Sequence, residues 1–176
     1  MRSSTPNALA LFAVLMITAG SAFADVQKKE GDSAEKTAAT PIFEEDFENG
    51  VDRWETTDDT NWSLHKNGEG KAFGLNRRTS DYEPEVRSPY NIALIKDLEA
   101  ESFVMTLKVK STLDTGNHRD CCLFFNYQDP KNFYYVHVGA VPDPHSGQIM
   151  IVRNDPRKAL TENTKKTPWN DQWHNL

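Results

Sequence analysis

The chain has few cysteines. Among its 176 residues only Cys121 and Cys122 carry thiols, and they are adjacent. Neighbouring residues of a strand point to opposite faces, so an ordinary disulfide between them is disfavoured. Two interpretations stay open: two small buried apolar side chains, or a strained vicinal disulfide, which an oxidising compartment would favour. The five histidines show no cysteine or histidine spacing typical of zinc.

A hydrophobic run long enough to cross a membrane is also lacking. The apolar run at residues 8–19 has about a dozen residues, against roughly 20 in a spanning helix. It follows Arg2 and precedes Ala22-Phe23-Ala24, a small-residue pattern typical of signal-peptide cleavage. We therefore predict a signal peptide over residues 1–24 and a secreted or periplasmic protein without a membrane span after cleavage. An apolar first helix of the domain is the alternative.

Glycine and basic charge are scarce. The nine glycines form no phosphate-binding loop and no dinucleotide fingerprint, so no cofactor is predicted. The chain carries 20 basic and 26 acidic residues, a net charge of −6. Removal of residues 1–24 takes Arg2 away and leaves a net charge near −7, with His neutral. This acidity argues against nucleic-acid binding, which depends on Lys and Arg that neutralise phosphates.

Two further segments follow the predicted signal peptide. Residues 25–40 contain charges of both signs and a single large apolar side chain, Val26, which is typical of a flexible polar linker. Residues 41–176 are about 135 in number, the usual size of one domain with one core. No internal repeat interrupts this domain.

Within residues 41–176 the patterns predict β-strands and no helix. Residues 102–110 alternate most clearly, with Phe103, Met105, Leu107 and Val109 on one face of a half-buried antiparallel strand. Shorter strands are predicted over the remaining apolar segments, residues 42–47, 62–65, 72–75, 91–95 and 147–153, with one more beginning near residue 173.

The most informative segment is residues 121–139, CCLFFNYQDPKNFYYVHVG. Two aromatic-rich runs are joined by an Asp-Pro-Lys-Asn turn, which predicts a β-hairpin at the centre of the domain. Both arms are apolar on both faces. Such strands usually lie mid-sheet with a cover on each side, and the second cover can be a loop or a ligand.

These segments together resemble the concanavalin A-like lectin/glucanase superfamily. The resemblance rests on the opening FEEDFENG at residues 43–50 with Trp54, the strand FVMTLKVKS, the hairpin, and Trp173-His174. It is nearest to laminin-G-like jelly rolls, including secreted bacterial 3-keto-disaccharide hydrolase domains. The resemblance implies an antiparallel β-sandwich of jelly-roll type. It also implies further strands after Trp173-His174, so the fold would be incomplete at the C-terminus, with an open sheet edge.

Carboxylates and histidines supply the candidates for chemistry. The Glu-x-Asp-x-x-Glu strand of retaining glucanases in this superfamily is not present. Glu44, Asp46 and Glu48 could share a strand face and offer oxygen ligands to calcium, although a solvated edge is the plainer interpretation. His137 follows three aromatic residues, and Asp120 precedes the hairpin. These two are the weak candidates for catalysis, while a hydrogen-bonded structural role is the alternative for His137.

Aromatic and amide side chains supply the candidates for sugar binding. Sugar rings stack their C–H faces on aromatic rings, and their hydroxyls seek polar partners. Tyr135, His137, Asn126 and Gln128 could line the concave sheet of a jelly roll. The leading hypothesis is a glycan-binding or accessory domain of an exported bacterial protein, with a polysaccharide or oligosaccharide as partner. A glycoside hydrolase of the 3-keto-disaccharide type and a structural or adhesion module are the alternatives.

Overall fold

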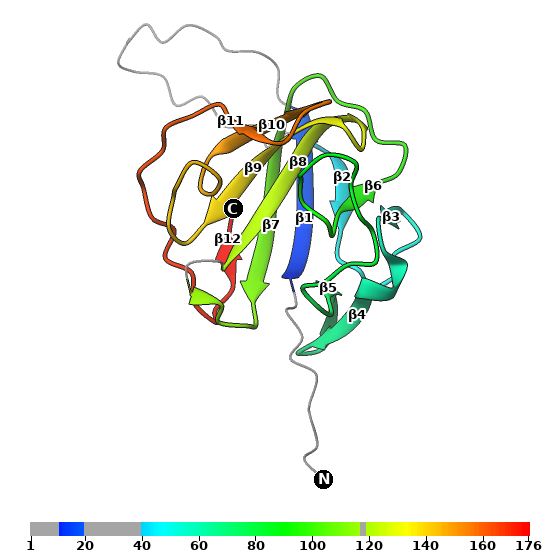
Figure 1. Ribbon diagram of the computed structural model, residues 1–176. Helices are drawn as coiled ribbons and strands as arrows, with labels where there is room; N and C mark the ends of the chain where they lie inside the picture. The colour runs from blue at the N-terminus through cyan, green and yellow to red at the C-terminus, as the bar shows by residue number, and fades with distance from the viewer. Residues whose placement is uncertain (1–10, 20–39, 117–118) are drawn as a thin grey trace, which may run out of the picture.

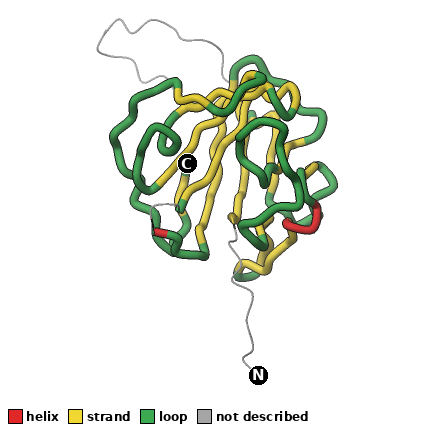
Figure 2. Tube along the Cα trace, in the orientation of Figure 1, coloured by secondary structure: helices red, strands yellow, loops and turns green. Residues whose placement is uncertain are grey.

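The computed structural model describes residues 11–19, 40–116 and 119–176, and for residues 11–19 it describes the backbone alone. The described chain is all-β with antiparallel sheets, as the sequence predicts (Figure 1). A short 3₁₀ turn at Asp59–Asn61 is among the helical segments drawn in Figure 2. The predicted linker over residues 25–40 lies, apart from Thr40, outside the described residues.

A six-stranded sheet contains the strands that begin and end the described chain. Its order is β12-β7-β1-β5-β4, and β2 pairs with β1 beside β5. The strands are β1 (Leu11–Ala19), β2 (Pro41–Glu45), β4 (Trp62–Asn67), β5 (Gly70–Leu75), β7 (Phe103–Ser111) and β12 (His174–Asn175). The strand expected to begin near residue 173 is therefore β12, and Leu107 and Leu176 extend its ladder through two backbone hydrogen bonds of 2.9 and 3.1 Å.

The alternation predicted for residues 102–110 is confirmed in β7 from Met105 to Val109, whereas Phe103, predicted on the buried face, is exposed. Leu107 and Val109 are buried and Met105 is half-buried, whereas Thr106 and Lys108 are exposed. One face of β7 thus packs into the interior and the other is open to solvent, as expected for an antiparallel sheet.

The backbone of residues 11–19 forms a strand inside this sheet. All nine residues of β1 pair antiparallel with β7, from Leu11 opposite Ser111 to Ala19 opposite Phe103. On its other side β1 pairs with β2 over residues 15–18 and with β5 at Ala13. This segment carries the signal-peptide pattern, and the signal peptide itself stays a prediction.

The predicted hairpin is confirmed in a second, four-stranded sheet of order β11-β10-β9-β8. Its strands are β8 (Asp120–Asp129), β9 (Asn132–Gly139), β10 (Ile149–Arg153) and β11 (Lys158–Ala159). At the turn Asp129 pairs with Asn132, and the Asp129 carboxylate accepts hydrogen bonds from the Lys131 N–H at 2.7 Å and from the Asn132 amide. The predicted mid-sheet position is wrong for β8, because β8 ends the strand order of its sheet.

A third, small sheet joins β3 (Trp54–Thr56) to β6 (Ala93–Ile95). Between β3 and β4 the Asp58 carboxylate holds the turn together. It accepts hydrogen bonds from the Thr60 hydroxyl at 2.6 Å and from the Asp81 N–H at 2.8 Å, and it lies 3.3 Å from the Arg77 guanidinium. Asp58 therefore ties the β3–β4 connection to the segment that follows β5.

The apolar interior includes two clusters of buried side chains. Phe43, Leu107 and Val109 form the first, and Leu123 of β8 packs against it, so the six-stranded and four-stranded sheets are in contact there. The second cluster lies on the other face of the β8–β9 hairpin and is covered by Val86 from the segment between β5 and β6. Each face of the hairpin is thus covered, and the second cover is a loop segment.

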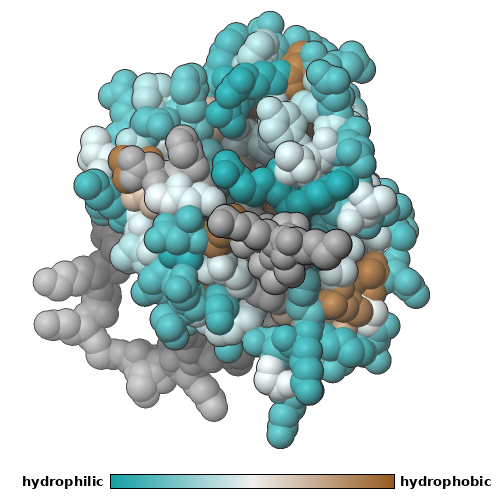
Figure 3. All heavy atoms as spheres, turned by 60° about the horizontal axis from the view of Figure 1, so that its bottom comes forward, coloured by the Kyte–Doolittle hydropathy of each residue, from teal (hydrophilic) through white to brown (hydrophobic). Residues whose placement is uncertain are grey.

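The face of the molecule shown in Figure 3 is largely hydrophilic, with small hydrophobic patches, and grey atoms hide part of it. Over the described residues, large hydrophobic side chains that stay exposed are spread along the chain. They are Ile42, Leu64, Tyr90, Phe103, Val104, Ile149 and Leu160.

Candidate functional site

The turn end of the β8–β9 hairpin gathers aromatic and polar side chains. The ladder is regular up to Phe125 opposite Tyr134 and then shifts before Asp129, because β8 carries extra residues there. Asn126 begins this bulge with a left-handed backbone (φ 47°), which asparagine tolerates better than most residues. Asn126 and Gln128, two of the predicted sugar-binding residues, are both exposed at the bulge.

An aromatic pair lies beside this bulge. The rings of Phe125 and Tyr134 stack with centroids 5.6 Å apart and planes 22° apart, and both side chains are half-buried. The Tyr134 hydroxyl accepts a hydrogen bond of 3.2 Å from the exposed Arg153 guanidinium of β10. We call Phe125, Asn126, Gln128, Tyr134 and Arg153 the hairpin-end strip. It combines ring surface with amide and guanidinium donors.

Tyr135 lies elsewhere, in the second core cluster. Its side chain is 0% exposed, and its ring packs against Phe124 and Phe133 at centroid distances of 5.6 and 6.1 Å. Burial raises the pKa of Tyr135 to about 12. No ring face is left open to a ligand from solvent, so Tyr135 does not join the exposed Asn126 and Gln128. The structure therefore does not place Tyr135 on one surface with Asn126 and Gln128, as was expected.

His137 and Asp120, the two catalytic candidates, are brought together. Their closest atoms, His137 Nε2 and Asp120 Oδ2, are 3.0 Å apart. His137 Nδ1 lies 2.8 Å from the His145 carbonyl oxygen. The His137 side chain is 8% exposed and that of Asp120 is 35% exposed. The pair is thus open to solvent mainly through the carboxylate.

Both ring nitrogens of His137 face an oxygen that accepts hydrogen bonds. The Nδ1 contact is with a backbone carbonyl, which can only accept a hydrogen bond, and the Nε2 contact is with a carboxylate oxygen. In this geometry His137 can orient the Asp120 carboxylate, which is the more exposed side chain of the pair.

The acidic opening of the domain does not form a metal-binding cluster. Glu48 accepts a hydrogen bond of 2.6 Å from the Lys71 N–H, and Asp46 accepts one of 3.0 Å from the Glu48 N–H. Glu44 is exposed. Within the described part of the chain, no group of three or more His, Cys, Asp or Glu is arranged to hold a metal ion. The structure thus lends the calcium hypothesis for Glu44, Asp46 and Glu48 no support.

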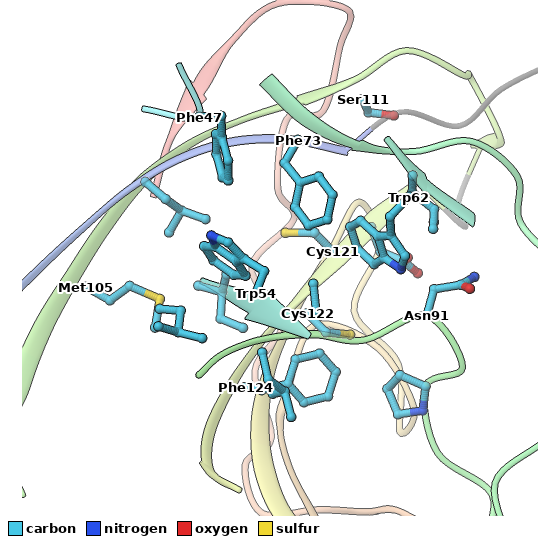
Figure 4. A pocket seen from close by; sticks show the side chains of 18 residues that line it. Phe47, Trp54, Trp62, Phe73, Asn91, Met105, Ser111, Cys121, Cys122 and Phe124 are labelled. Carbon is cyan, nitrogen blue, oxygen red and sulfur yellow. The ribbon is translucent and has the colours of Figure 1, made fainter. Parts of the chain in front are cut away.

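An apolar cavity of about 290 Å³ lies between β8 and the strands of the other two sheets. Figure 4 shows Trp54, Trp62 and Phe73 pointing into it from one side and Cys122 and Phe124 from the other. Among the described residues, the Trp62 indole N–H is buried there without a hydrogen-bond partner. Ser111, Asn91 and Asp120 add polar atoms at the cavity wall. A cavity of this kind suits an apolar group better than a sugar.

Both cysteines that line the cavity are free thiols. Burial, with a smaller contribution from the Asp120 charge, raises the pKa of Cys121 to about 12. Burial also raises the pKa of Cys122 well above its ordinary value. These findings agree with the interpretation of two small apolar side chains, with Cys121 buried and Cys122 half-buried.

Arg119 and Arg153 are polar residues that sequence reasoning did not identify as site residues. Arg119 is buried, donates to the Ser111 hydroxyl at 2.9 Å and forms an ion pair with Asp171. Arg119 lies in a polar turn in the sequence, where a single basic residue does not by itself indicate a buried ion pair. Arg153 reaches Tyr134 because Ile151 of β10 pairs with Tyr134 of β9, a register that the sequence does not encode locally.

Comparisons with known proteins add no assignment. No protein-family model matches the chain, and searches of curated proteins and of solved structures find no match. Over the described residues, no helix combines the length and apolar character needed to span a bilayer.

Proposed function

We propose that this chain is an exported carbohydrate-binding or accessory domain, a concanavalin A-like jelly-roll sandwich whose sugar site is the hairpin-end strip. The observation that carries the proposal is the half-buried Phe125–Tyr134 stack beside exposed Asn126 and Gln128. Antiparallel sheets that contact each other through β8 are compatible with the sandwich.

The chemistry of the strip suits a neutral sugar. An aromatic ring held by a stacked neighbour gives a flat apolar surface at little cost in side-chain entropy, and C–H faces of a pyranose can lie against it. The amides of Asn126 and Gln128 both donate and accept hydrogen bonds, as hydroxyl groups require. The net charge of −6 disfavours polyanionic partners, so neutral or basic glycans fit better than sulfated ones.

Isothermal titration of the full chain with neutral polysaccharides and disaccharides at millimolar concentration tests the proposal. Tyr134→Ala should weaken binding about tenfold, because it removes the stacking ring. Tyr90→Ala is the matched control, since Tyr90 is 48% exposed and lies outside the strip. The absence of a binding signal for the wild-type chain with every sugar would count against the site. An equal loss of affinity in Tyr134→Ala and Tyr90→Ala would also count against it.

A second function, glycoside hydrolysis of the 3-keto-disaccharide type, is favoured by the Asp120–His137 pair at 3.0 Å. Asp120, on the cavity wall, would take a proton from the water that attacks the anomeric carbon and would return it to the glycosidic oxygen as the C–O bond breaks. His137 would hold the carboxylate in place. Asp120→Asn should then abolish turnover of a 3-keto-disaccharide. His137→Gln should lower kcat and change the pH profile without removing binding. Turnover that persists in Asp120→Asn would eliminate this function.

A further inference from the structure

β1 occupies an interior position of the six-stranded sheet, with β7 on one side and β2 and β5 on the other. We call this position the strand slot. The residues that fill it, 11–19, belong to the segment with the signal-peptide pattern, and export removes such a segment. The mature chain would then lose an interior strand while β7 and β2, its partners along both sides, remain.

The sequence of β1 does not match its neighbours. Along β7 buried and exposed residues alternate, with Lys108 on the solvent side of the strand. A strand that belongs to the mature fold would alternate apolar and polar residues in the same way, because residues paired across two strands lie on the same face of the sheet. Residues 11–19 read LFAVLMITA, with Thr18 as the sole polar residue. Phe12 and Val14 stand opposite Lys110 and Lys108 in the register.

The cavity borders the strand slot. Met105, Leu107 and Ser111 line the cavity and pair with Ile17, Leu15 and Leu11 of β1. Protein interiors are packed closely, and empty apolar space of this size lowers stability. Apolar space of about 290 Å³ thus lies next to the β7 residues that border the slot.

We propose that the strand slot of the mature chain is an acceptor site for an extended segment of a partner polypeptide, which adds as an antiparallel strand to β7. The partner segment is apolar at the positions of Ala13, Leu15 and Ile17. It is acidic at the positions of Phe12 and Val14, opposite Lys110 and Lys108. At the position of Met16, which faces both Thr106 and Glu44, it carries a neutral polar residue.

Two physical terms favour such an occupant. A vacated slot exposes unpaired backbone N–H and C=O groups along β7 and β2, which are templates for strand addition. Main-chain hydrogen bonds supply affinity, and the alternating side chains supply register and choice of partner. This inference needs the predicted export of the chain and does not depend on sugar binding at the hairpin-end strip.

Strand exchange in the full chain tests the proposal. A protease site placed within residues 25–39 allows the folded protein to be cut between β1 and the rest. The cut protein is then mixed with a synthetic nine-residue peptide of the alternating apolar–acidic pattern. Two control peptides have the same composition in scrambled order, or the same order with alternate backbone amides N-methylated. Mass spectrometry follows the leader fragment and the amide hydrogen exchange of residues 103–111.

The expected result is that only the peptide with the alternating apolar–acidic pattern releases the fragment that contains β1. Residues 103–111 should stay protected from amide exchange. The double variant Lys108→Glu, Lys110→Glu should bind the acidic peptide at least tenfold more weakly. It should instead prefer a peptide with Lys at the same two positions. Retention of the leader against excess peptide would overturn the proposal. Equal uptake of scrambled and patterned peptides would also overturn it, as would closure of the slot by a second copy of the cut chain.

Discussion

Asp58 is a carboxylate that the fold stabilises in its ionised form. Hydrogen bonds from the Asp81 N–H and then from the Thr60 hydroxyl lower its pKa from 3.8 to about 2. A group whose folded pKa lies below its unfolded pKa stabilises the fold above the unfolded value. That contribution is lost as the pH falls from about 4 through about 2.

The unfolding free energy of the wild type should therefore fall between pH 4 and pH 2 more steeply than that of Asp58→Asn. Urea unfolding at a series of pH values measures both slopes. Asp52→Asn serves as the control, because the Asp52 side chain is exposed. Parallel slopes in the wild type and Asp58→Asn would contradict the role assigned to Asp58.

The two cysteines should be unreactive in the folded chain. Cys121 and Cys122 are free thiols whose pKa values are raised by burial, so little thiolate exists at neutral pH. Iodoacetamide should modify neither in native buffer and both in urea, as measured by intact mass. A native mass lower by two hydrogens, or labelling before unfolding, would instead indicate a vicinal disulfide or an open site.

At the scale of elements, the β8–β9 hairpin packs its two faces unequally. Phe133 is 1% exposed in the second core cluster, whereas Phe125 on the other face is half-buried in the hairpin-end strip. Phe133→Ala should cost about 3–5 kcal/mol of unfolding free energy, as is typical of buried aromatic side chains. Phe125→Ala should cost clearly less. Similar losses in denaturant titrations of the two variants would show that the assignment of faces is wrong.

Local patterns determined which elements could be predicted. The alternation of β7 and the Asp129–Asn132 turn depend on neighbouring residues. The turn is confirmed, and the alternation is confirmed from Met105 to Val109 but not at Phe103. The closeness of Asp120 and His137 depends on the bulge after Phe125. An uninterrupted ladder from the turn would set His137 opposite Phe124, but the extra residues in β8 set it opposite Cys122. A bulge depends on packing across the whole sheet, so the sequence did not predict it.

The strand order of the whole molecule was less accessible from sequence. The edge position of β8 and the place of residues 11–19 beside β7 both follow from pairings between distant segments. Such pairings are selected by burial across the domain and leave no periodic signal. The covering of both hairpin faces could be expected, because an apolar pattern on each face requires a cover on each side.

Arg119 links the start of the hairpin to the C-terminal segment. It is buried, donates to Ser111 of β7 and forms an ion pair with the exposed Asp171. Arg119→Ala should lower the unfolding free energy by about 1–3 kcal/mol, because the Ser111 hydroxyl then loses a charged donor in the interior. Lys158→Ala, which removes an exposed pair with Asp155, should change it by less than about 0.5 kcal/mol. Equal effects in thermal unfolding would exclude Arg119 as a link between distant segments.

The most direct test of the proposed carbohydrate-binding function is a titration of the ¹⁵N-labelled chain with neutral oligosaccharides, followed by amide and side-chain chemical shifts. The account predicts shifts confined to Phe125, Asn126, Gln128, Tyr134 and Arg153, with none around the Trp62 and Phe73 rings of the cavity. Saturable shifts centred on the cavity, or no shift with any sugar at millimolar concentration, would contradict it.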